Sequence, residues 1–251
     1  MTAFLLSLAL QIAPPEKPAA AYDPASAKSV VEHVSYNTRT TKSYEATWKG
    51  RLAVPRSDPL DYTGRCVWVR PGVLYSHYTA SGGDDKKIVL AGPGRAWVYH
   101  SLVGWVTADE AGIPGAGRGI QNPDEALAVL SKNPAGAKLV EPGVVELAFE
   151  GADIERIMKE QAQQGAFDWK KSKAVLRLTS DDQRRLKTLV CKATLVSSDP
   201  KVQGEVTYDA TIDVQGYDQA TELAFTDEKK KAIPLSKKIA EQIQNVLKET
   251  P

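Results

Sequence analysis

Apolar and polar residues alternate in several segments of the chain, and this alternation predicts β-strands. The clearest segment runs from Tyr44 to Val54, where Tyr44, Ala46, Trp48, Gly50, Leu52 and Val54 alternate with Glu45, Thr47, Lys49 and Arg51. Successive side chains of a strand point to opposite faces of a sheet. We therefore expect a half-buried strand in which Trp48 is buried and Lys49 is exposed.

Further strand-like segments follow at close intervals. They are Tyr62–Arg70, Val73–Thr79, Lys87–Ala91, Ala96–His100, Val103–Thr107, Lys138–Val140, Val144–Phe149, Lys173–Thr179, Leu186–Val196 and Glu205–Gln215. Turn residues such as Pro71-Gly72 and Gly92-Pro93-Gly94 separate several of the early ones. Connections this short join antiparallel neighbours, because a parallel crossover needs about a dozen residues or more. The spacing thus predicts an antiparallel meander.

Apolar residues at helical spacing mark four other segments. These segments are Pro24–His33, Pro123–Lys132, Asp153–Gln164 and Leu235–Lys248. A glycine-rich stretch without periodicity, Ala108–Asn122, precedes the second of them, and loops of this length in compact domains are usually functional or mobile. Together the elements predict an α+β fold: a curved antiparallel β-sheet, an incomplete barrel, with helices covering its concave face.

The chain begins with an apolar segment that is typical of the central part of a signal peptide. Ala3–Ala13 is too short to span a bilayer as a helix, and Ala19-Ala20-Ala21 offers small residues to a signal peptidase. No Lys or Arg precedes the apolar run, and a short buried element of a cytoplasmic protein is the alternative. We expect residues 1–21 to be a signal peptide and residues 22–251 to form one periplasmic or secreted domain without an integral membrane segment.

The charge balance excludes some classes of partner. The chain has 32 basic and 31 acidic side chains, so its formal net charge is +1. No overall electrostatic field favours binding to nucleic acid or to an anionic membrane surface. We therefore expect no nucleic-acid partner.

The sequence carries no pattern that indicates catalysis, a cofactor or a metal site. His33, His77 and His100 lack metal-binding spacing, and a nucleophile elbow, a phosphate-binding loop and a dinucleotide fingerprint are all missing from the sequence. Adjacent carboxylates such as Asp181-Asp182 fall in predicted turns. Cys66 and Cys191 lie in separate strand-like segments, and the sequence leaves a disulfide between them open. We expect a protein that is not an enzyme.

Large aromatic residues are concentrated on the predicted meander. Two interpretations of them remain open: an ordinary core, or a concave sheet face that is partly open to an apolar ligand, since such side chains line ligand pockets. The candidate lining residues of an apolar cavity are Trp48, Trp68, Leu74, Tyr78, Trp97, Tyr99 and Trp105.

The order of three short motifs resembles the periplasmic lipoprotein-carrier superfamily, which includes LolA, LolB and related lipid-binding domains. The motifs are Arg70-Pro71-Gly72 with the strand after it, the basic and apolar run Lys87-Ile88-Val89-Leu90, and Gly94-Arg95-Ala96-Trp97-Val98-Tyr99. The resemblance covers roughly residues 24–107. The insert Ala108–Asn122, the helix Asp153–Gln164 and the C-terminal helix have no clear counterpart in the short carriers.

The resemblance implies an incomplete β-barrel in which acyl chains lie between the sheet and a helical lid. It therefore implies an exported, non-catalytic carrier or sensor that binds a lipid or the acyl chain of a lipoprotein. The alternative is an envelope protein-interaction or regulatory domain with a packed barrel and no ligand. In the first case the partners are a lipid or an acylated lipoprotein, and in the second another envelope protein.

Overall fold

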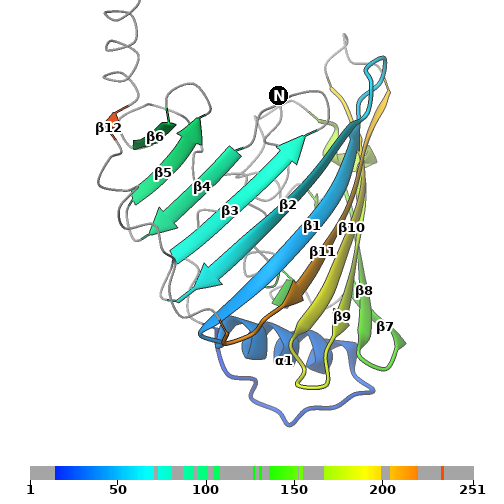
Figure 1. Ribbon diagram of the computed structural model, residues 1–251. Coiled ribbons are helices and arrows are strands. Elements are labelled where there is room, and N and C mark those ends of the chain that lie inside the picture. Colours follow the sequence, from blue (N-terminus) through cyan, green and yellow to red (C-terminus); the bar gives the residue numbers. More distant parts are fainter. Residues whose placement is uncertain are drawn as a thin grey trace, which may run out of the picture.

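A single twelve-stranded sheet dominates the chain (Figure 1). The computed structural model describes residues 15–70, 73–80, 87–92, 95–100, 104–107, 127, 130–131, 136–151, 153–154, 167–198, 204–219 and 233–234. In residues 73–107 and 233–234 it describes the backbone. The strands are β1 (Ser43–Ala53), β2 (Leu60–Val69), β3 (Val73–Ala80), β4 (Lys87–Gly92), β5 (Arg95–His100), β6 (Gly104–Thr107), β7 (Ala137–Glu141), β8 (Val144–Glu150), β9 (Lys173–Ser180), β10 (Leu186–Val196), β11 (Glu205–Gln215) and β12 (Ile233–Pro234).

The order of the strands confirms the predicted meander. It runs β12-β6-β5-β4-β3-β2-β1-β11-β10-β9-β8-β7, so β1 to β6 and β7 to β11 are two runs of consecutive neighbours joined by the antiparallel pair β1 and β11. The sheet curves without closing, as Figure 1 shows, which confirms the predicted α+β class with an incomplete barrel. No sequence pattern predicted β12, which pairs in parallel with β6, because a two-residue strand has no measurable period.

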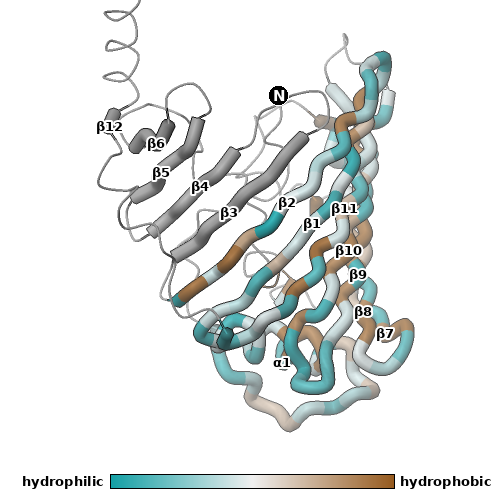
Figure 2. The backbone as a smooth tube through the Cα atoms, viewed as in Figure 1, coloured by the Kyte–Doolittle hydropathy of each residue, from teal (hydrophilic) through white to brown (hydrophobic). Residues whose placement is uncertain are grey.

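Alternation along β1 is confirmed at the level of single residues. Trp48 is 5% exposed, and Lys49 next to it is exposed. The same alternation runs along β10 and β11, where hydrophobic and hydrophilic positions follow one another in Figure 2. Each of these strands therefore contributes one face to the core and the other to solvent.

Helix α1 (Ala27–Arg39) is longer at its C-terminal end than the apolar periodicity predicted. It begins at a cap, where the Ser26 side chain accepts a hydrogen bond from the Ser29 amide. Its apolar side consists of Val30, Val31 and Val34, all fully buried. The next residues on that side, Ser35 and Thr38, are polar and yet buried. The apolar spacing therefore predicted an end of the helix that lies too early in the sequence.

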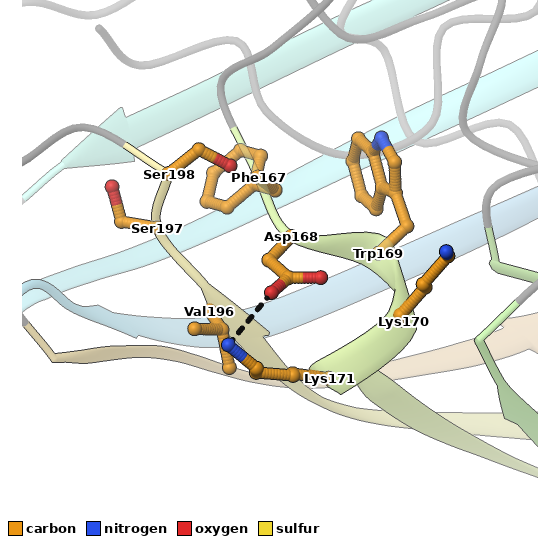
Figure 3. Close-up of a pocket in the computed structure, with 8 residues that line it drawn as sticks. All are labelled: Phe167, Asp168, Trp169, Lys170, Lys171, Val196, Ser197 and Ser198. Atoms are coloured by element: carbon orange, nitrogen blue, oxygen red, sulfur yellow. Dashed lines mark ion pairs between the residues drawn. The ribbon is translucent and has the colours of Figure 1, made fainter.

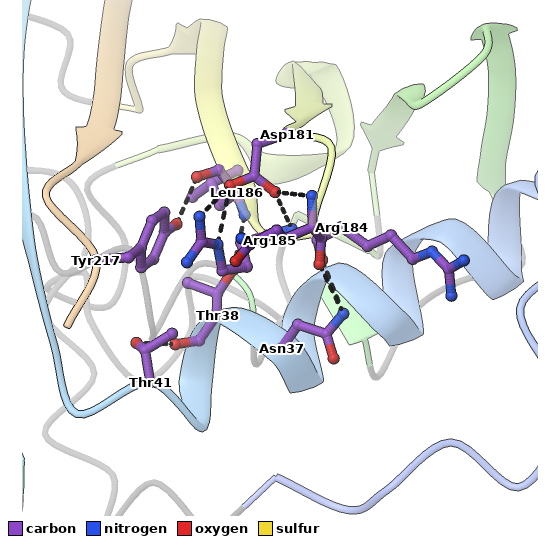
Figure 4. A network of polar contacts seen from close by, with 9 residues as sticks. Asn37, Thr38, Thr41, Asp181, Arg184, Arg185, Leu186 and Tyr217 are labelled. Atoms are coloured by element: carbon purple, nitrogen blue, oxygen red, sulfur yellow. Dashed lines mark hydrogen bonds and ion pairs between the residues drawn. The ribbon is translucent and has the colours of Figure 1, made fainter.

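The C-terminal half of α1 is fixed to the sheet by hydrogen bonds (Figure 4). The Thr38 hydroxyl oxygen accepts a 2.7 Å hydrogen bond from the Leu186 amide, and the Asn37 side chain donates to the carbonyl of Arg184. Directly after β2, the Arg70 guanidinium donates to the carbonyl oxygens of Thr38 and Thr41. A cation at the C-terminal end of a helix also complements the helix dipole. Arg70 therefore holds the helix against the sheet.

A first test concerns this attachment. Thr38→Val keeps the size of the side chain but removes the acceptor of the Leu186 amide, which then lies buried without a partner. We expect the free energy of unfolding to fall by about 1–2 kcal/mol, measured by urea denaturation. Thr40→Val is the matched control, because the Thr40 hydroxyl is exposed and bonds only within its own helix. Equal losses in the two variants would contradict the assignment.

The remaining predicted helices are described only in part. Leu127 and Leu130 are helical and fully buried in the core, as the apolar side of Pro123–Lys132 predicted. The rest of Asp153–Gln164 beyond Ile154, the loop Ala108–Asn122, the helix Leu235–Lys248 and the apolar segment Ala3–Ala13 lie outside the described residues. Within the described part of the chain, no helix is long and apolar enough to span a membrane.

Candidate functional site

The sheet face that packs against α1, called the inner face here, is buried unevenly. It contains Tyr44 and Trp48 of β1 together with the apolar positions of β8 to β11. On β11 every inner-face residue from Val206 to Val214 is between 3% and 7% exposed. On β2 the corresponding residues Leu60, Tyr62, Gly64 and Trp68 are half-buried, and only Cys66 among them is fully buried. We call these five positions the β2 stripe.

A glycine lets an aromatic ring lie flat on the β2 stripe. Gly64 pairs directly with Trp48 across the β1–β2 ladder. A Cβ atom on Gly64 would overlap the Trp48 indole at Cε2 and Cζ2, so the ring occupies the space that any other residue would fill. Glycine inside a strand normally weakens it, and here it permits close approach of a neighbour. The indole therefore covers the backbone of β2 rather than standing upright on the sheet.

The neighbouring pair repeats the arrangement in the opposite direction. Tyr62 of β2 pairs with Gly50 of β1, and a Cβ on Gly50 would lie 2.5 Å from Tyr62 Cζ. The Tyr62 ring stacks on Tyr208 of β11, with centroids 6.0 Å apart and planes inclined by 19°. Two rings thus lie low over two adjacent strands. The result is a flat aromatic surface at the middle of the sheet, flanked on one side by the packed core of β8 to β11.

Trp68 ends the β2 stripe near α1. Its ring packs against the core of the inner face, and the Arg70 guanidinium lies 5.9 Å from the ring centroid. The indole Nε1 is buried and has no hydrogen-bond partner among the residues that the structure describes. A buried polar atom is normally paired, so this donor requires an explanation.

The other end of the inner face has an open depression of about 580 Å³ beside the short 3₁₀ helix η2 (Trp169–Lys171), shown in Figure 3. Phe167 and Trp169 line it with ring centroids 5.4 Å apart, and both pack against the core. The Lys171 ammonium lies 3.0 Å from the Asp168 carboxylate. Its hydrogen bond to Asp168 lowers the pKa of that carboxyl. The rim thus combines half-buried aromatic rings with exposed charge.

The outer face of β2 carries two ion pairs. Arg65 forms a 2.7 Å ion pair with Glu45 of β1, and Arg51 lies 3.8 Å from Asp61. The side chains of Arg65, Arg51 and Asp61 are more than half exposed, and such pairs contribute little to stability. The outer face is therefore polar from Asp61 to Arg65, whereas Val67 beyond it is apolar and buried.

The register of the strands assigns the seven predicted lining residues to the two faces of the sheet. Directly paired residues of regular antiparallel strands share a face. Trp68 pairs with Tyr44 and Leu74, and Tyr78 pairs with Gly64, whose other partner is Trp48. Trp48, Trp68, Leu74 and Tyr78 therefore occupy inner-face register positions.

The other three predicted lining residues belong by register to the opposite rows. Trp97 pairs with Leu90 across the β4–β5 ladder. The same row of directly paired residues continues across the sheet through Tyr75 and Val67 and ends at Glu45, which is on the outer face. Tyr99 and Trp105 pair with each other in the row of Arg65. The physical reason is the two-residue period: within β5, Trp97 and Tyr99 share a face, and the pairing fixes which face it is.

The two cysteines form no disulfide with each other. Cys66 is on β2 and Cys191 on β10, with β1 and β11 between them. Three strand spacings amount to about 14 Å, whereas disulfide Cα atoms lie roughly 4.4–6.8 Å apart. The disulfide that the sequence left open is therefore excluded in this fold.

Burial also makes these thiols unreactive, which gives a second test. Desolvation, with a smaller contribution from the Asp209 carboxylate, raises the pKa of Cys191 to about 12. The reactive thiolate is then nearly absent at neutral pH, and Cys66 is fully buried. We expect Ellman's reagent to detect no thiol in the folded protein at pH 8 and two thiols after denaturation. A thiol that reacts rapidly in the folded protein would contradict the burial.

Other candidate reactive groups have local roles. His33 donates from Nδ1 toward the Ser29 carbonyl of its own helix turn at 2.8 Å. Asp181 accepts hydrogen bonds from the amides of Gln183 and Arg185 and pairs with the Arg185 guanidinium, as expected of a turn residue. Within the described residues, no cluster of His, Cys, Asp and Glu could hold a metal ion. The side chains of His77 and His100 lie outside the described part.

No family model matches the sequence, and no curated protein matches it. The search of solved structures finds a LolA superfamily protein from Nitrosomonas europaea, 11% identical, with a TM-score of 0.35 over 79% of this chain and 95% of that chain. It also finds a DUF1329 family protein from Desulfovibrio piger, 12% identical, with a TM-score of 0.33 over 81% of this chain and 97% of that chain. A putative outer membrane lipoprotein-sorting protein domain from Vibrio parahaemolyticus is 9% identical, with a TM-score of 0.33 over 81% and 96%.

The first of these proteins is described as a member of the superfamily that the sequence resembles. At these identities and TM-scores the neighbours say nothing about a ligand, so the proposals below depend on this chain's own residues. The sequence did not single out Tyr62, Gly50 and Gly64, although the structure brings them together with Trp48. A glycine at an inner-face position beside an aromatic residue of the next strand was the signal that could have identified them.

Proposed function

We propose that the chain is an exported, non-catalytic carrier or sensor that binds the acyl chain of a lipid or of an acylated lipoprotein. The acyl chain lies along the β2 stripe. The observation that carries the proposal is the half-exposed apolar surface of β2 beside fully buried apolar positions on β10 and β11. A sheet that needed only a core would bury both to the same extent.

The shape of the stripe suits an elongated apolar ligand. Leu60 and Trp68 are eight residues apart on one strand, so the stripe extends about 27 Å. The flat Trp48 and Tyr62 rings leave the backbone of β1 and β2 covered by apolar surface with little relief. Each methylene group that the ligand buries contributes about 0.8 kcal/mol, and part of this gain is offset by the cost of ordering the chain.

Binding is tested with the neutral dye N-phenyl-1-naphthylamine, whose fluorescence rises in apolar surroundings. We expect the purified protein to bind the dye, fatty acid to displace it, and salt to change the affinity little, because no charged cluster lies on the stripe. Tyr62→Asp places a carboxylate on the stripe and should weaken binding by roughly tenfold or more.

Thr63→Asp is the matched control, since Thr63 is the next residue on β2 and faces solvent. We expect this variant to bind the dye like the unaltered protein. Equal affinities of the two variants, with both folded by circular dichroism, would show that the ligand does not contact β2.

A packed domain without a ligand is the second candidate, and the packing of β8 to β11 favours it. Leu147, Leu178 and Leu186 are fully buried there, with α1 and Leu127 against them. In that case neither dye nor lipid binds, and the surface would serve to recognise another envelope protein. The dye experiment separates the two candidates.

We further propose that residues 1–21 direct export and that residues 22–251 are the mature domain. Tyr22 contacts the domain already: its ring lies 5.3 Å from the His33 ring and 4.0 Å from the Arg184 guanidinium. We expect the protein recovered from the envelope fraction of an exporting host to begin near Tyr22. N-terminal sequencing that finds Met1 there would contradict cleavage.

A further inference from the structure

We infer that the ligand presents a carbonyl or carboxylate oxygen to the indole N–H of Trp68, so that the site takes acyl compounds in preference to plain hydrocarbons. The inference rests on the proposed function and adds to it the chemical class of the ligand and the direction in which the ligand lies.

The inference is based on a hydrogen-bond donor without a partner, the indole N–H of Trp68. Trp68 Nε1 is buried and has no hydrogen-bond partner among the described residues. An indole nitrogen can only donate, so its single proton requires an acceptor. Leaving such a donor buried and unpaired is costly, and folded proteins rarely do so without a functional reason.

Arg70, next to Trp68, is the donor for several carbonyl oxygens around the end of α1. Its guanidinium, which lies over the Trp68 ring, donates to the carbonyl oxygens of Thr38 and Thr41. The Arg70 backbone amide donates to the carbonyl oxygen of Lys42. Trp68 Nε1 donates to none of these oxygens. The missing acceptor is then supplied by the molecule that enters the site.

The position of Trp68 fixes which end of the ligand carries the oxygen. Trp68 lies at the α1 end of the β2 stripe, whereas Tyr62 and the half-buried Leu60 lie toward the other end. An acyl chain that follows the stripe from Leu60 reaches Trp68 with its carbonyl end. The acceptor is the carboxylate of a free fatty acid or the carbonyl of an ester, and both carry the same oxygen beside an alkyl chain.

The test compares dodecanoic acid, methyl dodecanoate and dodecane as competitors of N-phenyl-1-naphthylamine. Trp68→Phe keeps an aromatic ring and removes the N–H. We expect the affinity for the ester to fall by several-fold and that for the acid by roughly tenfold or more, since hydrogen bonds to charged groups are stronger. The affinity for dodecane should change little. A larger loss for the acid than for the ester identifies the carboxylate as the bound group, and equal losses identify the shared carbonyl.

Two controls keep the outcome decisive. Trp48→Phe makes the same chemical change on the same face, and we expect it to shift the three affinities alike. If Trp68→Phe does not fold, β-(3-benzothienyl)alanine at position 68 replaces the N–H with sulfur at nearly constant shape. The inference is wrong if either change at position 68 shifts the three affinities alike or leaves them all unchanged. If the unaltered protein binds none of the three compounds, the proposed function itself fails.

Discussion

Replacing Trp48 with alanine is expected to lower the free energy of unfolding by about 3–5 kcal/mol, the range for truncating a large aromatic side chain in a core. Trp48 is 5% exposed, and its ring fills the space above Gly64. Alanine leaves that space empty, because Gly64 has no side chain with which to fill it. The loss is measured by urea denaturation of both proteins, with the slope of the transition checked for change.

Lys49→Ala provides the control for this loss. Lys49 is the adjacent residue of β1 and is exposed on the outer face, so its truncation should change stability by no more than about 0.5 kcal/mol. A loss below about 1 kcal/mol for Trp48→Ala would mean that Trp48 borders an open surface rather than a packed core. That result would also contradict the close packing of the Trp48 ring on Gly64.

Adding a methyl group to Gly64 is expected to destabilise the protein by about 2–3 kcal/mol, in the upper part of the range for overpacking. The group that must move is the Trp48 indole, which is rigid and buried, so the strain cannot be relieved by a flexible chain end. Alanine otherwise suits the interior of a strand better than glycine. Whether Gly64→Ala raises or lowers the free energy of unfolding therefore depends on the Trp48 ring.

The double variant tests that dependence. In the Trp48→Ala protein the overlap is gone, and Gly64→Ala should then be neutral or slightly stabilising. The coupling free energy between the two sites should be about 2 kcal/mol, as for residues in direct contact. If Gly64→Ala costs the same in both backgrounds, the ring does not lie over Gly64, and the flat aromatic surface is not formed in the way described.

Alternation and turn residues predicted the sheet closely, because they act locally. Leu186–Val196 and Glu205–Gln215 have the bounds that the sequence indicated, since a period of two runs along all of Glu205–Gln215 and from Leu189 to the end of the other strand. The end of α1 was missed because Thr38 is buried through a hydrogen bond from a residue 148 positions away in sequence. Such a long-range partner leaves no trace in local periodicity.

The site was predictable only to the level of residue type. Aromatic enrichment singled out Trp48 and Trp68, which the structure places in or against the core of the inner face. Whether Trp97 and Trp68 belong to the same face of the sheet could not be predicted from the sequence, because the answer depends on the register across β3 and β4. The glycine and aromatic pairs are likewise a property of strand pairing, since Gly50 and Tyr62 come together only through the β1–β2 ladder.

The central claim is that the chain carries an acyl compound, and native mass spectrometry of the protein purified from an exporting host without detergent tests it most directly. The expected spectrum contains, beside the mass of the bare protein, a complex whose added mass is released on collisional activation and is identified as a fatty acid or an acylated lipid. The added mass should be lost in the Tyr62→Asp protein and kept in Thr63→Asp. Bare protein alone in every preparation, including protein incubated with fatty acid before analysis, would contradict the claim.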